Sequence, residues 1–231
     1  MNVLAIFSHP DDEVLGCGAT LSTLAASGHE VHACILATGS TSRSGIAASE
    51  AEEEIGQLQM AANQAIQCLG GKSVIFGGFP DNRMDSVPLL DVVHFIEKVA
   101  GELVPDVVFT QHCGDLNIDH RVTHEAVLTA FRPLPGLKPT TIYSCEVLSS
   151  TEWASSSMPG FQPNSFVPVS SDALEAKQQA MACYTGEIRS WPHPRSREGI
   201  NHQAALRGSQ CGYEFAEAFH VVRDFPFSVG G

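Results

Sequence analysis

The sequence contains few basic residues. Of its 231 residues, 13 are Lys or Arg and 26 are Asp or Glu, which gives a formal net charge of −13 at pH 7. A surface of this charge repels nucleic acid and anionic membranes. We therefore expect neither as a partner, and we expect any phosphate to be bound by individual arginines.

Long apolar runs are also missing. No run reaches the roughly 20 residues that a membrane-spanning helix needs. Met1 and Asn2 lead directly into the first apolar segment, without the basic stretch and small-residue cleavage site of a signal peptide. These features predict a cytoplasmic protein that does not insert into membranes.

The cysteines lack the paired spacing of zinc sites and disulfide frameworks. There are seven, at positions 17, 34, 68, 113, 145, 183 and 211. An odd, scattered set is typical of reduced thiols in a cytoplasmic protein. The sequence therefore indicates neither a cysteine-based metal site nor a disulfide framework.

Two nucleotide-binding signatures are incomplete. Gly16 and Gly18 follow the first apolar run, but a dinucleotide fingerprint needs a third glycine at position 21, which is Leu21. The Gly71-Lys72-Ser73 segment ends like a phosphate-binding loop, but the first glycine of that motif would fall on Ile66. A Gly-x-Ser-x-Gly elbow is absent, which disfavours a serine hydrolase.

Apolar and helix-like segments alternate through most of the chain. Apolar runs at 3–8, 31–37, 73–76, 106–110 and 140–147 alternate with helix-like stretches near 15–27, 49–69, 89–101, 119–131 and 171–183. This alternation predicts an α/β fold of the Rossmann-like type, with an open, mostly parallel sheet and helices on both faces.

The pattern weakens toward the C-terminus. Residues 149–168 are rich in Ser and Pro and predict a long surface excursion, and residues 185–212 show no clear period. Long loops in compact domains are usually functional or mobile. We expect a single domain over 1–231, in which the loop-rich portion 148–231 completes the functional site.

Two polar clusters follow apolar runs. His9-Pro10-Asp11-Asp12 follows the first run, and Asp115 to His120 follows the run that ends at Thr110. If these strands are neighbours in a parallel sheet, both clusters lie at the same edge, where open α/β sheets bind their ligands.

Two imidazoles and one carboxylate can then meet at that edge. His9, Asp12 and His120 would form a metal site with one coordination position left for water, which is the arrangement of a catalytic centre. A structural alternative exists for the first cluster, because Pro followed by two acids also suits a helix N-terminus.

The motifs resemble the LmbE-like, or PIG-L, family of zinc-dependent N-acetylglucosaminyl deacetylases. The family signature His-Pro-Asp-Asp-Glu is present as His9 to Glu13, and the late Asp-His pair is present as Asp119-His120. Further segments resemble a bacterial, sugar-pathway branch of the family, namely Thr38-Gly39 and residues 79–85, 149–153 and 192–196.

The resemblance implies roles for the residues of the motifs. His9, Asp12 and His120 would bind one Zn²⁺ per chain, and Asp11 would be the general base that takes the proton of the attacking water. Glu13 would either support these residues or serve as an acid at a helix start. Asp119 would either orient a ligand or cap the following helix.

One position departs from the family pattern. Many members have a histidine three residues before the last ligand, where this chain has Asn117. An amide can donate a hydrogen bond to an oxyanion, but it cannot deliver a proton. Candidates for the proton role are Asp11 acting twice, His112 at the end of the fourth strand, His124 one helical turn beyond His120, and His193 between two prolines.

The implied activity is removal of an N-acetyl or similar acyl group from an amino sugar or its conjugate. Arg43, Arg83 and Asp85 are candidate contacts to sugar hydroxyls or a phosphate. Alternatives are an amidase acting on a thiol-sugar conjugate and a non-catalytic sugar- or nucleotide-binding module. A homo-oligomer is also expected, because a late histidine reaches the site from a neighbouring subunit in some relatives.

Overall fold

The computed structural model describes residues 1–39 and 48–225. These residues form six helices, seven strands and two short 3-10 helices. In chain order they are β1 (Asn2–Phe7), α1 (Asp12–Ala26), β2 (Glu30–Ala37), α2 (Ala48–Cys68), β3 (Ser73–Phe79), η1 (Met84–Ser86), α3 (Leu89–Leu103), β4 (Val107–Gln111), α4 (Ile118–Ala130), β5 (Thr141–Cys145), η2 (Thr151–Trp153), β6 (Ser165–Pro168), α5 (Ser171–Cys183), α6 (Arg197–Cys211) and β7 (Ala216–Arg223).

The strands form one open sheet in the order β3-β2-β1-β4-β5-β7-β6. Strands β1 to β5 pair in parallel, whereas β7 runs antiparallel to both β5 and β6. The predicted open, mostly parallel sheet is therefore confirmed. The sequence pattern located its five parallel strands and missed β6 and β7.

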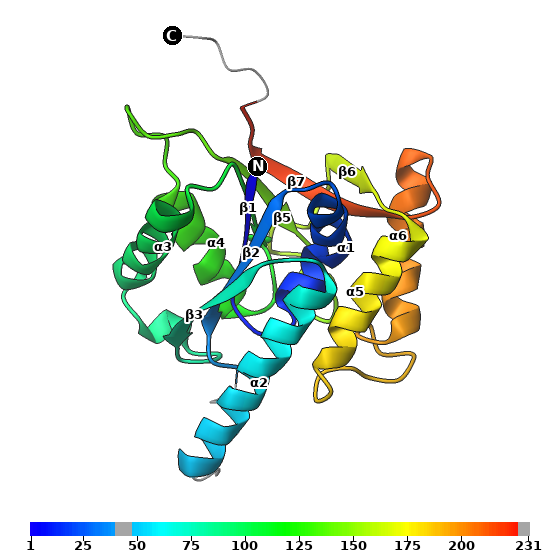
Figure 1. Cartoon of the computed structure of the whole chain (residues 1–231), viewed down its shortest axis with the longest axis horizontal. Coiled ribbons are helices and arrows are strands. Elements are labelled where there is room, and N and C mark those ends of the chain that lie inside the picture. Colours follow the sequence, from blue (N-terminus) through cyan, green and yellow to red (C-terminus); the bar gives the residue numbers. More distant parts are fainter. Residues whose placement is uncertain (40–47, 226–231) are drawn as a thin grey trace.

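Helices cover both faces of the sheet, as predicted (Figure 1). Alternate side chains of β1 point to opposite faces, and both faces are buried. Phe7 belongs to the core beneath α1, α2, α5 and α6, whereas Ile6 belongs to the core beneath α3 and α4. This double burial explains why the first strand is an uninterrupted apolar run.

The prediction of an irregular segment over 185–212 is wrong in its second half. Helix α6 begins after Ser196, whose Oγ accepts a hydrogen bond from the Gly199 backbone N–H at 2.9 Å, and ends at Gly212 in the left-handed conformation. Its polar composition hides the helical period, since its few buried residues include Ile200 and Ala204. The predicted surface excursion over 149–168 likewise contains η2 and β6.

Helix α1 contains a break that a buried ion pair stabilises. The backbone of Cys17 is non-helical (φ −149°, ψ 17°). The freed N–H groups of Ala19 and Thr20 donate to the Glu217 carboxylate at 3.2 and 2.7 Å. Lys177 Nζ donates to the carbonyl of Leu15 at 2.8 Å and to Glu217 at 2.6 Å. The pair therefore satisfies both sides of the break.

Strands β1 and β4 are adjacent, with Val3 opposite Val107. Their carboxyl ends therefore bring the two polar clusters to one edge of the sheet, as predicted. Within residues 1–39 and 48–225, no helix is long and apolar enough to cross a membrane.

Candidate metal and catalytic site

A polar cavity of about 200 Å³ lies at the carboxyl edge of the sheet. The loop after β1 forms its floor with His9, Pro10 and Asp11. The described residues that complete its wall are Gly39, Leu58, Asp81, Asn82, Asn117, Glu187 and Arg195. Segments from the whole length of the chain thus meet at the end of β1.

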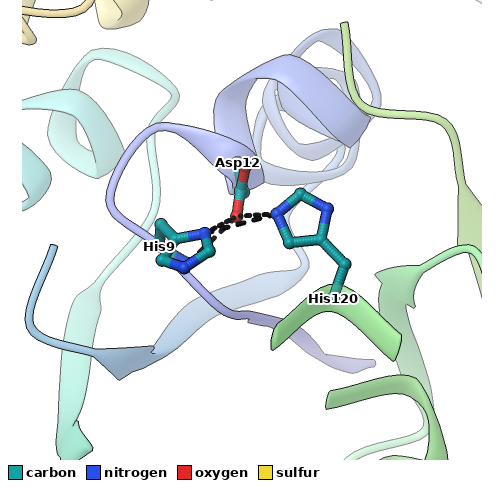
Figure 2. A group of neighbouring side chains, drawn as sticks. All are labelled: His9, Asp12 and His120. Atoms are coloured by element: carbon teal, nitrogen blue, oxygen red, sulfur yellow. Dashed lines mark hydrogen bonds and ion pairs between the residues drawn. The ribbon is translucent and has the colours of Figure 1, made fainter. Parts of the chain in front are cut away.

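The side chains of His9, Asp12 and His120 converge beside this cavity (Figure 2). Asp12 Oδ2 lies 3.2 Å from His9 Nδ1 and 3.2 Å from His120 Nε2. The two ring nitrogens are 3.3 Å apart. The three donor atoms therefore form a nearly equilateral triangle.

This triangle has the dimensions of a zinc site. When nitrogen and oxygen donors lie about 2.0–2.1 Å from a tetrahedral ion, neighbouring donors are about 3.3 Å apart. In addition, Asp12 Oδ1 is buried and has no hydrogen-bond partner among the described residues. Two imidazoles and a carboxylate thus fit a divalent metal both in chemistry and in spacing.

Carboxylates lie behind both imidazoles. His9 Nε2 is 3.0 Å from Asp119 Oδ2, and His120 Nδ1 is 3.1 Å from Asp115 Oδ1. Such contacts orient metal-binding histidines and fix which ring nitrogen faces the ion. Asp115 is itself held by Ser150 and by Thr151, whose Oγ1 donates at 2.5 Å.

Of the two roles considered for Asp119, the structure supports orientation of a ligand. The N-cap of α4 is Asn117, whose Oδ1 accepts from the backbone N–H of Asp119 at 2.9 Å. Asp119 Oδ1 accepts from the backbone N–H of Met84 at 2.9 Å, and its other oxygen faces His9. The helix-capping role expected as an alternative is therefore wrong for Asp119.

A second group of possible ligands shares His9. Asp81 Oδ1 and Asp119 Oδ2 lie 3.4 and 3.0 Å from His9 Nε2. The first group uses Nδ1 of the same ring. A metal bound through Nδ1 leaves Nε2 to donate a hydrogen bond, so these two carboxylates are suited to act as acceptors behind the ligand.

The electrostatic field at the cluster favours positive charge. Burial by itself would lower the pKa of His9, but hydrogen bonds to Asp119 and Asp12 raise it to about 10. Burial would also lower the pKa of His120. The charges of Asp12 and Asp115 and their hydrogen bonds to the ring outweigh burial and raise this pKa to about 9. Because these carboxylates stabilise a cation on either ring, they would also stabilise a metal ion between the rings.

Asp11 occupies a strained position beside the cluster. Its φ of 100° lies in the left-handed region, which is uncommon for residues other than glycine and costs on the order of 1 kcal/mol or more. The Asp11 backbone N–H donates to Glu13 Oε2 at 3.1 Å, and the Asp11 carbonyl accepts from Leu15 N at 2.9 Å. These bonds hold the strained turn.

Arg195 lies against the Asp11 carboxylate. Its Nη1 is 2.9 Å from Asp11 Oδ2 and 2.8 Å from Glu187 Oε2. Burial raises the pKa of Asp11, and the Arg195 charge opposes that rise. The pKa of Asp11 therefore stays well above its usual range, and the guanidinium offsets part of the effect of burial.

Glu13 forms hydrogen bonds that hold the turn at Asp11. It is fully buried and accepts hydrogen bonds from the Asp11 backbone N–H and, at 2.6 Å, from the Tyr184 hydroxyl. Of the two roles left open for this residue, the contacts favour support of the catalytic loop. Burial raises the pKa of Glu13 to about 7 despite the bond from Tyr184.

Of the other two predicted catalytic residues, Asn117 lines the cavity and His193 does not. Asn117 lines the cavity, and its Nδ2 donates to Asn82 Oδ1 at 3.0 Å. His193 is not among the lining residues, and its Nδ1 accepts from the backbone N–H of Arg195 at 3.1 Å. His193 therefore contacts the cavity wall through Arg195.

Two of the three predicted substrate contacts do not line the cavity. Arg83 and Asp85 are exposed and are not among the lining residues of the cavity. Arg43 lies outside the described residues. Their roles stay predictions.

Sequence reasoning missed several residues of the site, namely Asp115 as the partner of His120, Gln111 and Glu187. Gln111 Nε2 donates to Asp12 Oδ2 at 2.8 Å and so fixes the carboxylate from the end of β4. A signal for Arg195 existed, because it lies in the Pro-His-Pro-Arg-Ser segment already associated with the family.

The fold and the site together define a class of protein, an open α/β protein whose sheet edge carries a two-histidine, one-aspartate cluster suited to a metal. The chain belongs to the PIG-L family, since the family model described as GlcNAc-PI de-N-acetylase matches residues 4–131. The resemblance and the deacetylase class are thus confirmed. The matched region contains His9 to Glu13 and His120, whereas His193 and Arg195 lie beyond it.

One curated relative and one solved structure are similar to this chain. The uncharacterized deacetylase YaiS of Escherichia coli K12 is 33% identical over 138 residues, which are 58% of this chain and 69% of YaiS. The N,N'-diacetylchitobiose deacetylase of Pyrococcus horikoshii has a TM-score of 0.76 at 20% identity, covering 98% of this chain and 87% of the other.

The same fold also carries another reaction. GalB of Pseudomonas putida KT2440, a 4-carboxy-2-hydroxymuconate hydratase, has a TM-score of 0.76 at 19% identity, covering 100% of this chain and 99% of GalB. At such identities a structural likeness shows the fold alone. Function must therefore be argued from the site.

Proposed function

We propose that this protein is a zinc-dependent amidohydrolase that removes an acetyl, or similar acyl, group from an amino sugar or its conjugate. The observation that carries the proposal is the triangle of His9 Nδ1, Asp12 Oδ2 and His120 Nε2, which adjoins the Asp11 carboxylate at the floor of a polar cavity. Amide hydrolysis needs a strong nucleophile and a base beside it, and this arrangement offers both.

His9, Asp12 and His120 would hold one zinc ion per chain. When bound, the ion would supply a Lewis acid that activates water and polarises the acyl carbonyl. Asp119, Asp115 and Gln111 would keep the three ligands in place through the contacts described above.

Asp11 is the general base of the proposal. Its carboxylate would accept the proton of the attacking water and later return it to the leaving amine. Arg195 would oppose the rise in the pKa of Asp11 and orient its carboxylate, because its guanidinium is anchored at three points, to Asp11, to Glu187 and to Ser149 Oγ at 2.7 Å. Because the base is already held in position, the reaction does not pay the entropic cost of ordering it.

Asn117 is the proposed hydrogen-bond donor to the developing oxyanion. One N–H of its amide is used by Asn82, and the second can donate to the acyl oxygen as negative charge builds up. Asn117 cannot deliver a proton, so the proton role falls to Asp11 or His193. The contact between His193 and Arg195 supports an additional, indirect role for His193.

The cavity wall suits a hydroxyl-rich substrate. Asp81, Asn82 and Glu187 offer acceptors and donors around an opening of about 200 Å³. Arg43, Arg83 and Asp85 would contact sugar hydroxyls or a phosphate of the substrate. Arg83 and Asp85 are exposed and follow the lining residue Asn82 closely in the sequence. A thiol-sugar conjugate is the alternative substrate, and it would use the same acyl chemistry.

The C-terminal portion 148–231 would complete the site within a single domain. Glu187 and Arg195 line the cavity, and β7 supplies Glu217 to the break in α1. The proposal also includes a homo-oligomer, which light scattering of the purified protein tests.

Metal content and acyl release test the proposal together. We expect about one zinc ion per chain by mass spectrometry, and release of acetate from free, nucleotide-linked or glycosidic N-acetyl sugars. His120→Ala should abolish both. His94→Ala, which changes an exposed histidine on α3, is the matched control and should abolish neither.

Three results would contradict the proposal. Full metal occupancy in His120→Ala would show that His120 is not a metal ligand. Metal binding without acyl release from any N-acyl sugar, combined with hydration of an unsaturated carboxylate, would favour a hydratase. Absence of metal from the native protein would favour a non-catalytic binding module.

A further inference from the structure

Two cysteines from distant parts of the chain meet at the contact between α2 and α5. Cys68 is the last residue of α2, and Cys183 is the last residue of α5. Their Sγ atoms are 4.0 Å apart, although the residues are separated by 115 positions in the sequence. Both helices pack on the same side of the sheet and contact each other (Figure 1).

The pair is accessible to solutes. Cys68 is exposed and Cys183 is partly exposed. Cys17 and Cys145 also interact with each other, but both are completely buried. Because thiol oxidation requires access as well as proximity, only the pair at the α2–α5 contact combines the two among the described cysteines.

We propose that Cys68 and Cys183 form a reversible oxidation site, in which a low-molecular-weight disulfide such as oxidised glutathione converts the two thiols to one intramolecular disulfide. This goes beyond the proposed hydrolase activity and does not depend on it.

The reaction balances in two exchange steps. The Cys68 thiolate attacks the glutathione disulfide, forms a mixed disulfide and releases one glutathione thiolate. The Cys183 thiolate then attacks Sγ of Cys68, closes the protein disulfide and releases the second glutathione. Two protein thiols are oxidised, and one glutathione disulfide is reduced to two thiols.

The geometry permits closure with little rearrangement. A disulfide bond is about 2.05 Å long, so each Sγ must move by about 1 Å, which side-chain rotation at the two helix ends can provide. Cys68 reacts first because it is the more exposed thiol. Burial, together with the neighbouring Cys68, raises the pKa of Cys183 to about 11, which disfavours Cys183 as the thiol that attacks glutathione disulfide first.

The pair lies one residue from a side chain of the candidate site. Tyr184 follows Cys183 directly, and its hydroxyl donates to Glu13 at 2.6 Å. A disulfide would therefore fix the end of α5 to the end of α2 and restrict movement of the segment that leads to Glu187 and Arg195.

Oxidation of the purified, fully reduced protein with oxidised glutathione tests the proposal. We expect the number of free thiols, counted after denaturation, to fall from seven to five. Peptide mapping without reduction should show one cross-linked product that joins the peptides of Cys68 and Cys183. Dithiothreitol should restore all seven thiols.

Variants identify the order of the steps. In Cys183→Ser, the mixed disulfide on Cys68 cannot be resolved, so one glutathione should remain attached at Cys68. In the matched control Cys211→Ser, which changes a partly exposed cysteine of α6, the cross-link should form as in the native sequence. Native protein that keeps all seven thiols, that retains glutathione on Cys68, or that forms a different cross-link would overturn the proposal.

Discussion

The guanidinium of Arg195 lies 2.9 Å from the carboxylate of Asp11, although the two residues come from opposite ends of the chain. Asp11 projects from a strained turn at the end of β1, and Arg195 comes from the segment that precedes α6. The contact joins the predicted base of the N-terminal motif to the C-terminal portion that completes the cavity.

Removal of Arg195 should impair the base without removing the metal. Arg195→Met raises the pKa of Asp11 further and frees its carboxylate, so we expect turnover to fall roughly 10- to 100-fold at unchanged metal content. Arg195→Lys should recover part of the loss, because it keeps the charge but not the fork of donors. Arg197→Met, whose guanidinium pairs with Glu175 outside the cavity, is the control. An equal loss in that control would contradict a specific role.

Substitutions of the adjacent Asp11 and Asp12 should have different effects on metal content and turnover. Asp11→Asn keeps the three donors of the triangle, so we expect retained metal and turnover lowered roughly a hundredfold or more, the scale of a lost general base. Asp12→Ala removes one donor and should lose the metal first. Metal analysis alongside acyl-release rates measures both effects. Equal metal loss in the two variants would refute this division of roles.

His193→Ala should lower turnover while metal content and substrate affinity stay nearly unchanged, because an interaction made mainly in the transition state affects rate rather than ground-state binding. A double-mutant cycle with Arg195→Met locates the effect. If His193 acts through Arg195, the double variant is no slower than Arg195→Met alone. Additive losses would indicate an independent proton role, and normal turnover in His193→Ala would remove His193 from the mechanism.

The buried pair at the break in α1 should matter for stability. Lys177→Met leaves the Glu217 carboxylate buried without its partner, and we expect the free energy of unfolding to fall by about 3–5 kcal/mol. Lys72→Met removes an exposed ion pair with Glu30, which solvent screens, and should leave stability nearly unchanged. Urea denaturation compares the two. Similar small effects would show that the break in α1 does not need the ion pair.

Glu13 should make stability depend on pH. Its pKa is raised by burial from 4.5 to about 7, so the folded protein retains a proton that the unfolded chain releases. This contribution is fully present below about pH 4.5 and is lost as pH rises toward 7, by at most about 3 kcal/mol. Glu13→Gln should remove that slope from urea denaturation curves recorded between pH 5 and 8. Parallel pH profiles for both proteins would disprove the raised pKa.

The N-terminal half of the fold and the centre of the site could be predicted because their signals are local. A strand buried on both faces is an uninterrupted apolar run, so Val3 to Phe7 and Val107 to Thr110 could be placed in a parallel sheet. Polar residues that end such runs must emerge at the carboxyl edge. His9, Asp12 and His120 could therefore be brought together from sequence order alone.

The C-terminal portion gave weaker signals. Helix α6 has a mostly polar sequence and buries only a narrow face, so its period does not stand out. Strand β6 is four residues long and β7 pairs antiparallel at the end of the sheet, where alternation with helices no longer applies. These elements are defined by what they pack against rather than by their own pattern.

The residues of the chain by themselves indicated the α/β class, the family motif and the three residues of the candidate metal site. Only the tertiary structure decided that Asp115 lies behind His120, that Arg195 faces Asp11, and that Cys68 meets Cys183. The reason is physical. Periodicity and strand ends are encoded over a few neighbouring residues, whereas contacts between distant side chains exist only after the helices and strands have packed.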